Sequence, residues 1–496
     1  MIKRPFRWVV PAAVLACGAL GAVPAHAAIQ APDVAKVKAA GPSAPACTYP
    51  DSTPSQPHVQ PFLHCYTPAQ IRAAYGVDNV PENGAGQTIV LMDSYGTPTG
   101  RQDLQTFHDT FFPTAPKPHY TEVYPYGRPD FRHGTGNGQS GPAAAAGWAG
   151  EATLDIEWAY AIAPAAHIVL VGVPPAETEG VQGFPNLFKA ISQQVDAYPA
   201  GTIFSMSFGV TEETFGGATA VQTARFDAVF KKGIAKGDTF FASSGDSGSL
   251  GVSKQHKDTA TYDHPTVGWP ASSPYVTSVG GTQLQYGWTW DPQSDVPFTA
   301  SGDFNPAYFN WTDGGNTNVV WDESWLPAAT GGGPSLIYPR PSWQDGVLPD
   351  QGNHRLVPDV AWNAAVNGGV LVYTSFFPDV NRVGWHIYGG TSAGSPQVAA
   401  LTALAAEHAG HGLGNINPAI YSANGAWFTD VLPVHQGAPG VISGDLTSNR
   451  MFDYNGDGQP VTWDPVPGWP VLNGYDMTTG WGTPNAGAYV TGVASS

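Results

Sequence analysis

The sequence is poor in charged side chains, and basic residues are the scarcest of them. Charged residues make up 12% of the 496 residues, about half of the ~25% that is usual in soluble domains. There are 21 Lys and Arg against 39 Asp and Glu, and the formal net charge is −18. Such a chain is a poor partner for nucleic acid, which attracts basic surfaces. Because few positive charges would remain to repel one another once carboxylates are protonated, the composition suits a protein that stays folded in acid.

Long apolar runs are missing after residue 27, which excludes a membrane span of ~20 residues there. The apolar run from Trp8 to Val23 follows three basic residues and precedes Ala25-His26-Ala27. This order is that of a secretory signal peptide, so we expect residues 1–27 to be removed and the protein to be secreted. Their removal would take the formal charge from −18 to −21. Cys17 is a loose match to a bacterial lipidation site, which leaves a lipid-anchored form as a minor alternative.

Cysteines are also few, and only Cys47 and Cys65 would remain after cleavage. In an exported chain this pair favours one disulfide that closes a short loop, with two free thiols as the alternative. Residues 28–60 are rich in Pro, Ala and Ser, so we expect a flexible or extended arm. From residue 61 the composition is globular and shows no linker or fixed-period repeat. Residues 61–496 are therefore expected to form the functional domain.

Short apolar segments alternate with helical patterns after residue 87. The expected strands are 88–93, 167–172, 203–207 and 239–243, and the expected helices are 151–162, 185–195 and 224–235. Continuous apolar strands separated by helices predict an α/β fold, a parallel sheet with helices on both faces. The Trp- and Gly-rich stretch 283–334 is expected to be an irregular insertion at the surface.

One serine lies in a turn of small residues that leads into an apolar helical segment. The segment runs Gly390-Thr391-Ser392-Ala393-Gly394-Ser395-Pro396. Gly390 and its neighbour Gly389 allow a tight turn, and Pro396 suits the first turn of a helix that we expect to begin there. Ser392 would then lie near unpaired N–H groups, where a serine can attack a carbonyl and the oxyanion is stabilised. A glycine-rich turn without chemistry is the alternative.

Glu151 and Asp155 are the candidates for the base that Ser392 needs. They lie four residues apart on an expected helix and share one face. Two carboxylates held together in partly apolar surroundings share a proton, and such a glutamate can accept the serine proton in acid while the aspartate orients it. On spacing alone, a solvated acidic pair is the alternative. His133-Gly-Thr resembles the histidine motif of subtilisins, and Asp93 ends a strand as their aspartate does, but the segment after His133 resists helix formation.

A third carboxylate, Asp246, follows the expected strand 239–243 in the turn Ser-Ser-Gly-Asp. An aspartic acid at this place can donate a hydrogen bond to an oxyanion when it is protonated. An ordinary Asx turn is the alternative reading of this residue alone. An acidic base and an acidic oxyanion donor would both operate at low pH.

These motifs, in this order, resemble the sedolisin (serine-carboxyl peptidase) family, which includes kumamolisin and the tripeptidyl-peptidases. The matching segments are 66–76, 150–155, 205–209, 243–246, 269–282, 358–362 and 389–393. Each one is weak alone, but the ordered set covers nearly the whole domain and is highly specific. The resemblance implies a subtilisin-like fold and endopeptidase or tripeptidyl-peptidase action at acid pH. It implies Ser392 as nucleophile, Glu151 as base, Asp155 as its partner and Asp246 in the oxyanion hole.

The resemblance also implies a substrate-binding edge and a metal. Ser207, Phe208 and Gly209 would form the edge that pairs with the peptide backbone. One calcium ion is implied in an irregular C-terminal region, with the ligands Asp430, Val431, Leu472, Gly474 and Asp476. Two carboxylates with backbone carbonyls suit Ca²⁺. Many relatives have glycine at the position of Leu472, which matters little for a carbonyl ligand.

A second loop, from Asp453 to Asp464, comes close to an EF-hand-type calcium loop. Aspartate replaces the usual final glutamate and no helical patterns flank the loop, so a glycine-rich turn is favoured over a second calcium site. The arm of residues 28–60 departs from the resemblance in another way. The family usually carries a long folded prodomain, and this arm is too short and too rich in proline to be one.

Two other classes of protein remain open. Residues 390–394 fit Gly-x-Ser-x-Gly and are followed by Asp430 and His435, the order of an α/β-hydrolase esterase. This alternative leaves Glu151, Asp155 and Asp246 without a role. The other alternative is a homologue that binds peptides without cleaving them. The expected partners are protein or peptide substrates, with no nucleic acid and no membrane span, and the expected state is a monomer.

Overall fold

The computed structural model describes most of the chain after the N-terminal arm. The described residues are 29–30, 65–131, 142–173, 183–216, 219–251, 262, 264–286, 289–290, 309–310, 316–323, 328–366, 368–376, 383–433, 446–451 and 466–496. The expected signal peptide, Cys47, His133, His435 and the 453–464 loop lie outside these residues.

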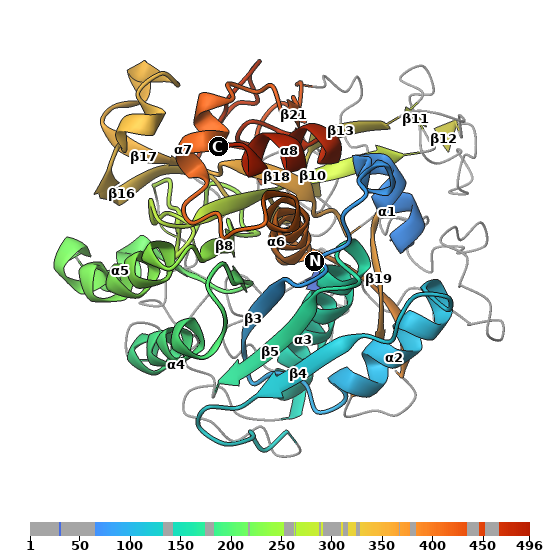
Figure 1. The fold of residues 1–496 in the computed structure, drawn as a ribbon. Helices are drawn as coiled ribbons and strands as arrows, with labels where there is room; N and C mark the ends of the chain where they lie inside the picture. The colour runs from blue at the N-terminus through green and yellow to red at the C-terminus, as the bar shows by residue number, and fades with distance from the viewer. Residues whose placement is uncertain are drawn as a thin grey trace, which may run out of the picture.

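An eight-stranded, mainly parallel sheet forms the centre of the molecule (Figure 1). Its strands are β3 (Thr88–Ser94), β4 (His119–Val123), β5 (His167–Val173), β6 (Ile203–Met206), β8 (Thr239–Ser243), β10 (Thr277–Tyr286), β13 (Asn316–Val320) and β18 (Val360–Asn363). The order is β13-β10-β8-β6-β3-β5-β4, and β18 also pairs with β10. Only the pairing of β13 with β10 is antiparallel among these described strands. The α/β fold predicted from the sequence is confirmed.

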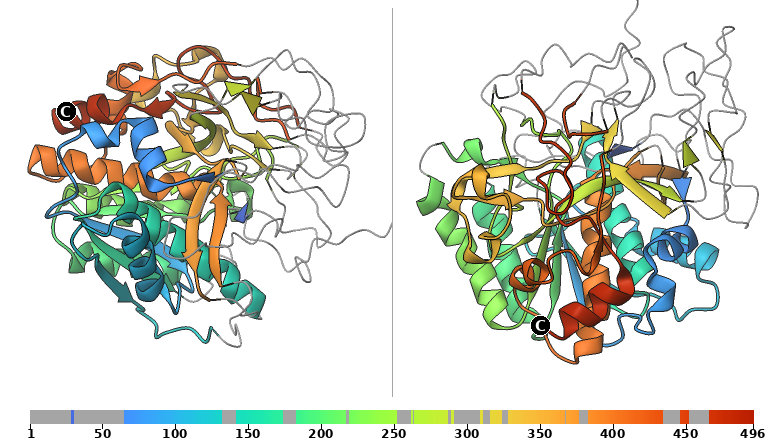
Figure 2. Two further views of the ribbon diagram at one scale, coloured as in Figure 1. Left: turned by 90° about the vertical axis from the view of Figure 1, so that its right-hand side faces the viewer. Right: turned by 90° about the horizontal axis from the view of Figure 1, so that it is seen from above.

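Helices cover both faces of this sheet. They are α1 (Pro68–Tyr75), α2 (Gly100–Phe111), α3 (Pro142–Ile162), α4 (Phe184–Ala197), α5 (Thr219–Ala235), α6 (Thr391–Ala409), α7 (Asn417–Ser422) and α8 (Ala486–Ala494). Seen from above, the green helices α4 and α5 lie on one side of the sheet, and α3 and α6 lie on the other (Figure 2). In β3, Ile89 and Leu91 join the core that contains α3 and α6. Val90 and Met92 join the core under α4 and α5, so the strand is buried on both faces.

A smaller sheet lies beside the central one. It contains β1 (Ile29–Gln30), β20 (Gly384–Gly389), β19 (Gly369–Thr374) and β2 (Cys65–Tyr66), in that order. In β1, Ile29 pairs with Gly389 and Gln30 with Tyr388, so the start of the arm runs along the strand that leads to Ser392. Cys65 is disulfide-bonded, as expected, and its partner lies outside the described residues.

Short two-stranded ribbons and 3-10 turns complete the described structure. The ribbons are β7 (Val210–Thr211) with β9 (Gly268–Trp269), β11 (Thr289–Trp290) with β12 (Phe309–Asn310), β14 (Asp322–Glu323) with β15 (Ala328–Ala329), β16 (Gly333–Pro339) with β17 (His354–Val357), and β21 (Phe428–Thr429) with β22 (Thr483–Pro484). The 3-10 turns are η1 (Val77–Asn79), η3 (Glu212–Phe215), η5 (Ser342–Gln344) and η6 (Pro349–Gln351).

The prediction of an irregular surface insertion at 283–334 is wrong for part of that stretch. β10 continues to Tyr286, and β13 pairs with it in the central sheet. Val319, Val320 and Trp321 are buried. The Val-Val-Trp run supplies enough apolar surface to hold an edge strand, although the polar residues before it hide that signal in the sequence.

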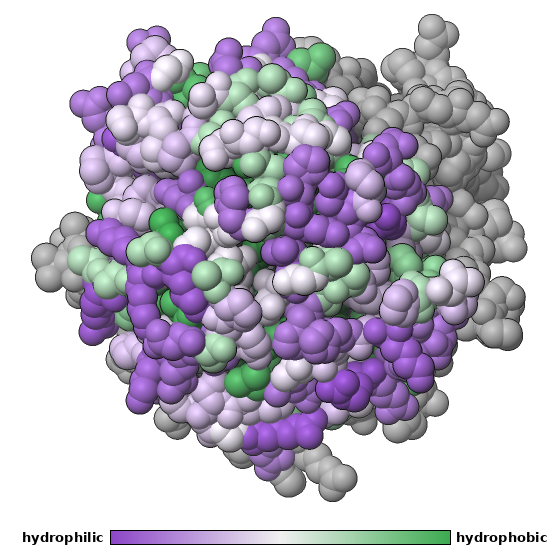
Figure 3. All heavy atoms as spheres, in the orientation of Figure 1, coloured by the Kyte–Doolittle hydropathy of each residue, from purple (hydrophilic) through white to green (hydrophobic). Residues whose placement is uncertain are grey.

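The described surface is mostly polar. Figure 3 shows hydrophilic residues spread over one face, with small hydrophobic spots between them. The large exposed hydrophobic residues come from separate parts of the chain: Tyr126, Leu336, Val383, Leu432 and Leu472. None of the helices in the described part of the chain has the length and apolarity needed to cross a bilayer.

Candidate active site

Three buried carboxylates, two from α3 and one from β3, lie close together. Glu151 and Asp155 lie on α3, one turn apart, and Asp93 lies near the end of β3. Each residue is 0% exposed, and each contributes a carboxylate oxygen to a group within 4.8 Å. The predicted solvated alternative for the acidic pair is therefore wrong. This cluster could hold either shared protons or a metal ion.

Burial and mutual repulsion keep protons on this cluster. Burial raises the pKa of Asp93 to about 8, and none of the described residues donates a hydrogen bond to either of its carboxylate oxygens. The pKa of Asp155 is raised well above its usual value, first by burial and then by the negative charges of Asp93 and Glu151. A carboxyl group that keeps its proton at mildly acidic pH can exchange it with a neighbour, as acid–base chemistry in acid requires.

Asp93 is the member of the cluster that the sequence did not predict. Its position at the end of an apolar strand was the available signal, because the carboxyl ends of parallel strands are where sites gather in open α/β sheets. Its distance from Glu151 depends on how α3 packs on the sheet, which the sequence alone does not show.

Gly150, which precedes Glu151 on α3, lies close to the side chain of Tyr388. A Cβ atom on Gly150 would lie 2.5 Å from the hydroxyl oxygen of Tyr388, on the strand that leads to Ser392. A larger residue at position 150 would therefore require the Tyr388 ring to move.

Ser392 lies inside the first turn of α6, which corrects the prediction that the helix begins at Pro396. The helix begins at Thr391, after Gly390 with φ 97°, a conformation that favours glycine. Pro396 is an internal residue and has no N–H to donate to the Ser392 carbonyl, its partner four residues back. The Ser207 hydroxyl lies 3.4 Å from that carbonyl oxygen. Because Pro396 cannot donate to the Ser392 carbonyl oxygen, that oxygen lacks its helical partner and is contacted by the Ser207 side chain instead.

Ser207 connects the two halves of the site. Its hydroxyl oxygen lies 3.0 Å and 2.9 Å from the two carboxylate oxygens of Asp155. The predicted edge residues Ser207, Phe208 and Gly209 are buried and follow β6, which ends at Met206, one residue earlier than expected. Their pairing with a peptide remains a prediction.

Asp246 lies against the N-terminus of α6. Its Oδ1 atom accepts hydrogen bonds from the Thr391 N–H at 2.8 Å and the Thr391 hydroxyl at 2.7 Å. Its Oδ2 atom is buried with no hydrogen-bond partner. Burial raises the pKa of Asp246 to about 6, although both bonds from Thr391 oppose the shift. In acid the free oxygen can therefore carry a proton and donate it to a neighbouring oxyanion.

Four of the five predicted calcium ligands make hydrogen-bonded pairs, Asp430 with Gly474 and Leu472 with Asp476. The Gly474 N–H donates to Oδ2 of Asp430 at 2.8 Å, and the Leu472 N–H donates to Oδ2 of Asp476 at 3.0 Å. Oδ1 of Asp430 is buried with no hydrogen-bond partner. Val431 is buried next to it in the chain. A buried carboxylate oxygen without a hydrogen-bond partner among the described residues, as in Asp430, is a ligand that suits a hard cation.

The sequence model of the subtilase family matches residues 84–419 of this chain. The chain belongs to the subtilase family. Within it, the chain is 30% identical to kumamolisin from Bacillus sp. (strain MN-32) over 412 residues, which is 81% of this chain and 61% of that protein. It is also 30% identical to sedolisin from Pseudomonas sp. (strain 101) over 300 residues, 60% of this chain and 43% of that protein.

A third relative of this subtilase is tripeptidyl-peptidase 1 from Homo sapiens, with 29% identity over 357 residues. That match covers 68% of this chain and 50% of the relative. The chain thus spans about half of the length of the curated relatives that it matches. The names of these relatives confirm the resemblance to the sedolisins.

The solved structure of Pseudomonas sedolisin, a serine-carboxyl proteinase complexed with two molecules of pseudo-iodotyrostatin, has the same fold. The TM-score is 0.60 at 23% identity, and the match covers 86% of this chain and 98% of that one. This likeness confirms the expected subtilisin-like arrangement of sheet and helices.

Proposed function

We propose that this subtilase is a secreted serine-carboxyl peptidase that hydrolyses peptide bonds at acid pH. The observation that carries the proposal is the buried Asp93–Glu151–Asp155 cluster, linked through the Ser207 hydroxyl to the first turn of α6 that holds Ser392. An imidazole base would be protonated in acid, whereas a carboxylate cluster that shares protons still has a basic oxygen. Relatives named as peptidases support peptides as the substrate class.

In the proposed reaction, the Ser392 hydroxyl oxygen attacks the carbonyl carbon of the peptide and gives its proton to Glu151. Asp155 holds the shared proton of the pair and orients Glu151, and Ser207 orients Asp155. The protonated Asp246 carboxyl donates to the oxyanion that forms. Glu151 then returns its proton to the leaving amine, which yields an acyl-enzyme on Ser392. Water, activated by Glu151, hydrolyses that ester in the second step.

The peptide would run along Ser207, Phe208 and Gly209 as an added strand, with backbone hydrogen bonds supplying affinity. The proposal includes export by the signal peptide of residues 1–27, an arm of residues 28–60, and a monomeric domain of residues 61–496. Whether cleavage occurs within chains or releases tripeptides depends on how far the binding groove extends.

The residues Asp430, Val431, Leu472, Gly474 and Asp476 would hold one calcium ion. The ion would supply a charged tie between the end of β21 and the loop before α8, two segments far apart in the sequence. Asp476 is suited to this role because the N–H groups and hydroxyls of Thr478 and Thr479 all bind its Oδ1, and so fix its carboxylate.

The decisive experiment measures cleavage of a peptide library between pH 3 and pH 7 by the wild type and three variants. Ser392→Ala and Glu151→Gln should each lower kcat at least ~100-fold with an unchanged circular dichroism spectrum. His133→Ala should remain active. The proposal is wrong if Glu151→Gln keeps wild-type activity while His133→Ala is inactive. Hydrolysis of simple esters at neutral pH that is lost in His435→Ala would instead indicate the esterase.

A further inference from the structure

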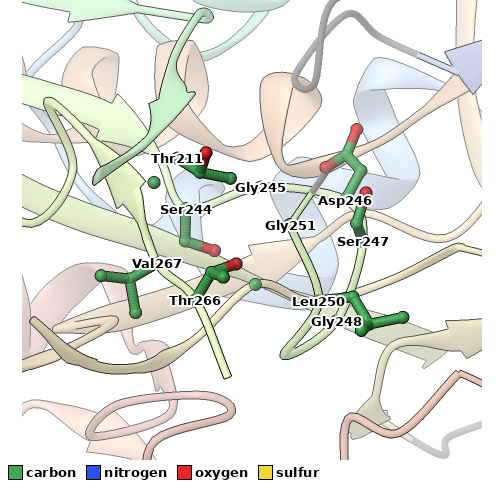
Figure 4. A pocket seen from close by; sticks show the side chains of 12 residues that line it. Thr211, Ser244, Gly245, Asp246, Ser247, Gly248, Leu250, Gly251, Thr266 and Val267 are labelled. Carbon is green, nitrogen blue, oxygen red and sulfur yellow. The ribbon is translucent and has the colours of Figure 1, made fainter. Parts of the chain in front are cut away.

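A small pocket adjoins Asp246. The lining residues are Thr211, Ser244, Gly245, Asp246, Ser247, Gly248, Leu250, Gly251, Thr266, Val267, Gly268 and Gly331. Asp246, Ser247 and Leu250 lie on one side, and Thr211, Thr266 and Val267 on the other (Figure 4). The cavity volume is about 20 Å³, which is room for about one water molecule.

This inference rests on the proposed function, which indicates where a bound peptide would lie relative to the pocket. The attacked carbonyl must lie between Ser392 and Asp246, the donor to its oxygen. The α-carbon on the acyl side is bonded directly to that carbonyl carbon, so its side chain begins within a few ångströms of Asp246. Thr211 of β7, the strand that directly continues the predicted substrate edge 207–209, lines the same pocket as Asp246. It therefore lies where the side chain just before the cut bond would enter.

Two threonines limit the depth of the pocket. A Cβ atom on Gly251 would lie 2.3 Å from Cγ2 of Thr211 and 2.3 Å from Oγ1 of Thr266. The backbone at Gly251 is therefore already in contact with both side chains, and they close this part of the pocket. The opposite backbone is equally tight, because a Cβ atom on Gly331 would lie 2.5 Å from the Ser244 carbonyl oxygen.

Apart from Asp246, the described lining residues carry no ionisable side chain. Hydroxyl groups come from Thr211, Ser244, Ser247 and Thr266, and apolar atoms from Leu250 and Val267. Among the described lining residues, Asp246 alone is ionisable, and it is protonated at the pH of the proposed reaction. A lysine or glutamate side chain entering this pocket would be desolvated without an opposite charge, which is unfavourable.

We infer that this pocket restricts cleavage to bonds that follow a small uncharged residue, glycine, alanine or serine, and that Thr211 and Thr266 set its size limit. For each extra methylene group of the substrate side chain that does not fit in the pocket, kcat/KM should fall about tenfold or more. The substrates of the proposed peptidase would therefore be peptides with a small uncharged residue before the cut bond.

The test is a set of peptides that differ only in the residue before the cut bond: Ala, Ser, Leu, Phe, Lys or Glu. For the wild type, kcat/KM should be at least ~10-fold higher for Ala and Ser than for Leu, Phe, Lys and Glu. In the double variant Thr211→Ala/Thr266→Ala, kcat/KM for the Leu peptide should rise about tenfold relative to kcat/KM for the Ala peptide. Thr266→Val, which keeps the size and removes the hydroxyl, should keep the preference for small residues.

A wild-type preference for Phe, Leu, Lys or Glu, or a Thr266→Val variant that accepts large residues, would overturn the size limit while leaving peptide hydrolysis intact. If no peptide is cleaved, the proposed function fails. The pocket is then tested by binding of the same peptides to the Ser392→Ala variant with fluorescence anisotropy. The inference predicts weaker binding of the Phe and Lys peptides, and equal binding of all six would overturn it.

Discussion

The hydroxyl oxygen of Ser207 lies within 3.0 Å of both carboxylate oxygens of Asp155. Ser207 was expected only as a backbone contact for the substrate. Its side chain instead contacts the buried Asp155 on α3, so in the proposed function the same residue would couple the substrate edge to the Asp93–Glu151–Asp155 cluster. Four predictions test this arrangement and its surroundings.

Replacing Ser207 with alanine should shift the pH–activity profile. The hydroxyl favours the ionised form of Asp155, so its loss raises the pKa of that residue further. A hydrogen bond to a charged group contributes about 1.5–3 kcal/mol, equivalent to about 1–2 pH units. We expect the low-pH limb of the profile of kcat against pH to move to higher pH by about one pH unit. Ser205→Ala is the matched control, because it removes a similarly buried hydroxyl whose partner is Ser395. Identical profiles for the Ser207 variant and the wild type would contradict the coupling.

Replacing Asp246 with asparagine should remove the decline of kcat/KM at high pH. The pKa of Asp246 is raised to about 6 by burial, so the donor form is present below about pH 6 and is lost as the pH rises through that value. The asparagine amide keeps a donor at every pH. We expect the variant to retain activity at pH 7 relative to its own maximum, measured as kcat/KM against pH. An unchanged decline above pH 6 would show that another group controls that limb.

Asp93 should make the wild type less stable as the pH rises. Its pKa is raised from 3.8 to about 8 by burial, so the folded protein binds a proton that the unfolded chain releases between these values. Stability is therefore highest below about pH 4 and falls by up to about 1.4 kcal/mol per pH unit toward pH 8. Asp93→Asn should flatten this dependence, measured as Tm between pH 4 and pH 8. Asp109→Asn, which removes an exposed carboxylate, is the control, and an equal slope in all three proteins would contradict the assignment.

Calcium removal should destabilise the C-terminal region. A chelator in excess should lower the Tm of the wild type, since an ion at 100 times its Kd stabilises by about 2.7 kcal/mol. Asp430→Asn should have a low Tm that neither calcium nor chelator changes. Asp457→Asn, in the loop from Asp453 to Asp464, should behave as the wild type. A calcium-dependent Tm in the Asp430 variant and not in the Asp457 variant would move the site to that loop.

The sequence predicted the central sheet well because its strands are short, apolar and buried on both faces, which leaves a signal that needs no tertiary information. β3, β5 and β8 each begin at the predicted residue. α3 begins at Pro142, well before the predicted start at residue 151. Its first turns are rich in alanine and glycine, so they lack the alternation of apolar and polar residues that marks an amphipathic helix.

The features that the sequence did not reveal depend on contacts between distant segments. Asp93 could be placed at a strand end, but its proximity to Glu151 requires α3 to cross above β3. The contact of Ser207 with the Ser392 carbonyl depends on Pro396 lying four residues after the serine, inside a helix rather than at its start. The size of the pocket beside Asp246 depends on threonines 55 positions apart, Thr211 and Thr266, which meet only in the folded protein.

The pairing of Ile29 with Gly389 has a practical consequence for anyone who purifies this protein. Gly389 lies three residues before Ser392, so an affinity tag fused ahead of residue 28 would start near the proposed nucleophile, where we expect it to interfere with added peptides. A tag after Ser496, which is exposed beyond α8, avoids that interference. Kinetic constants from N-terminally tagged protein should therefore be compared with those from the C-terminally tagged form.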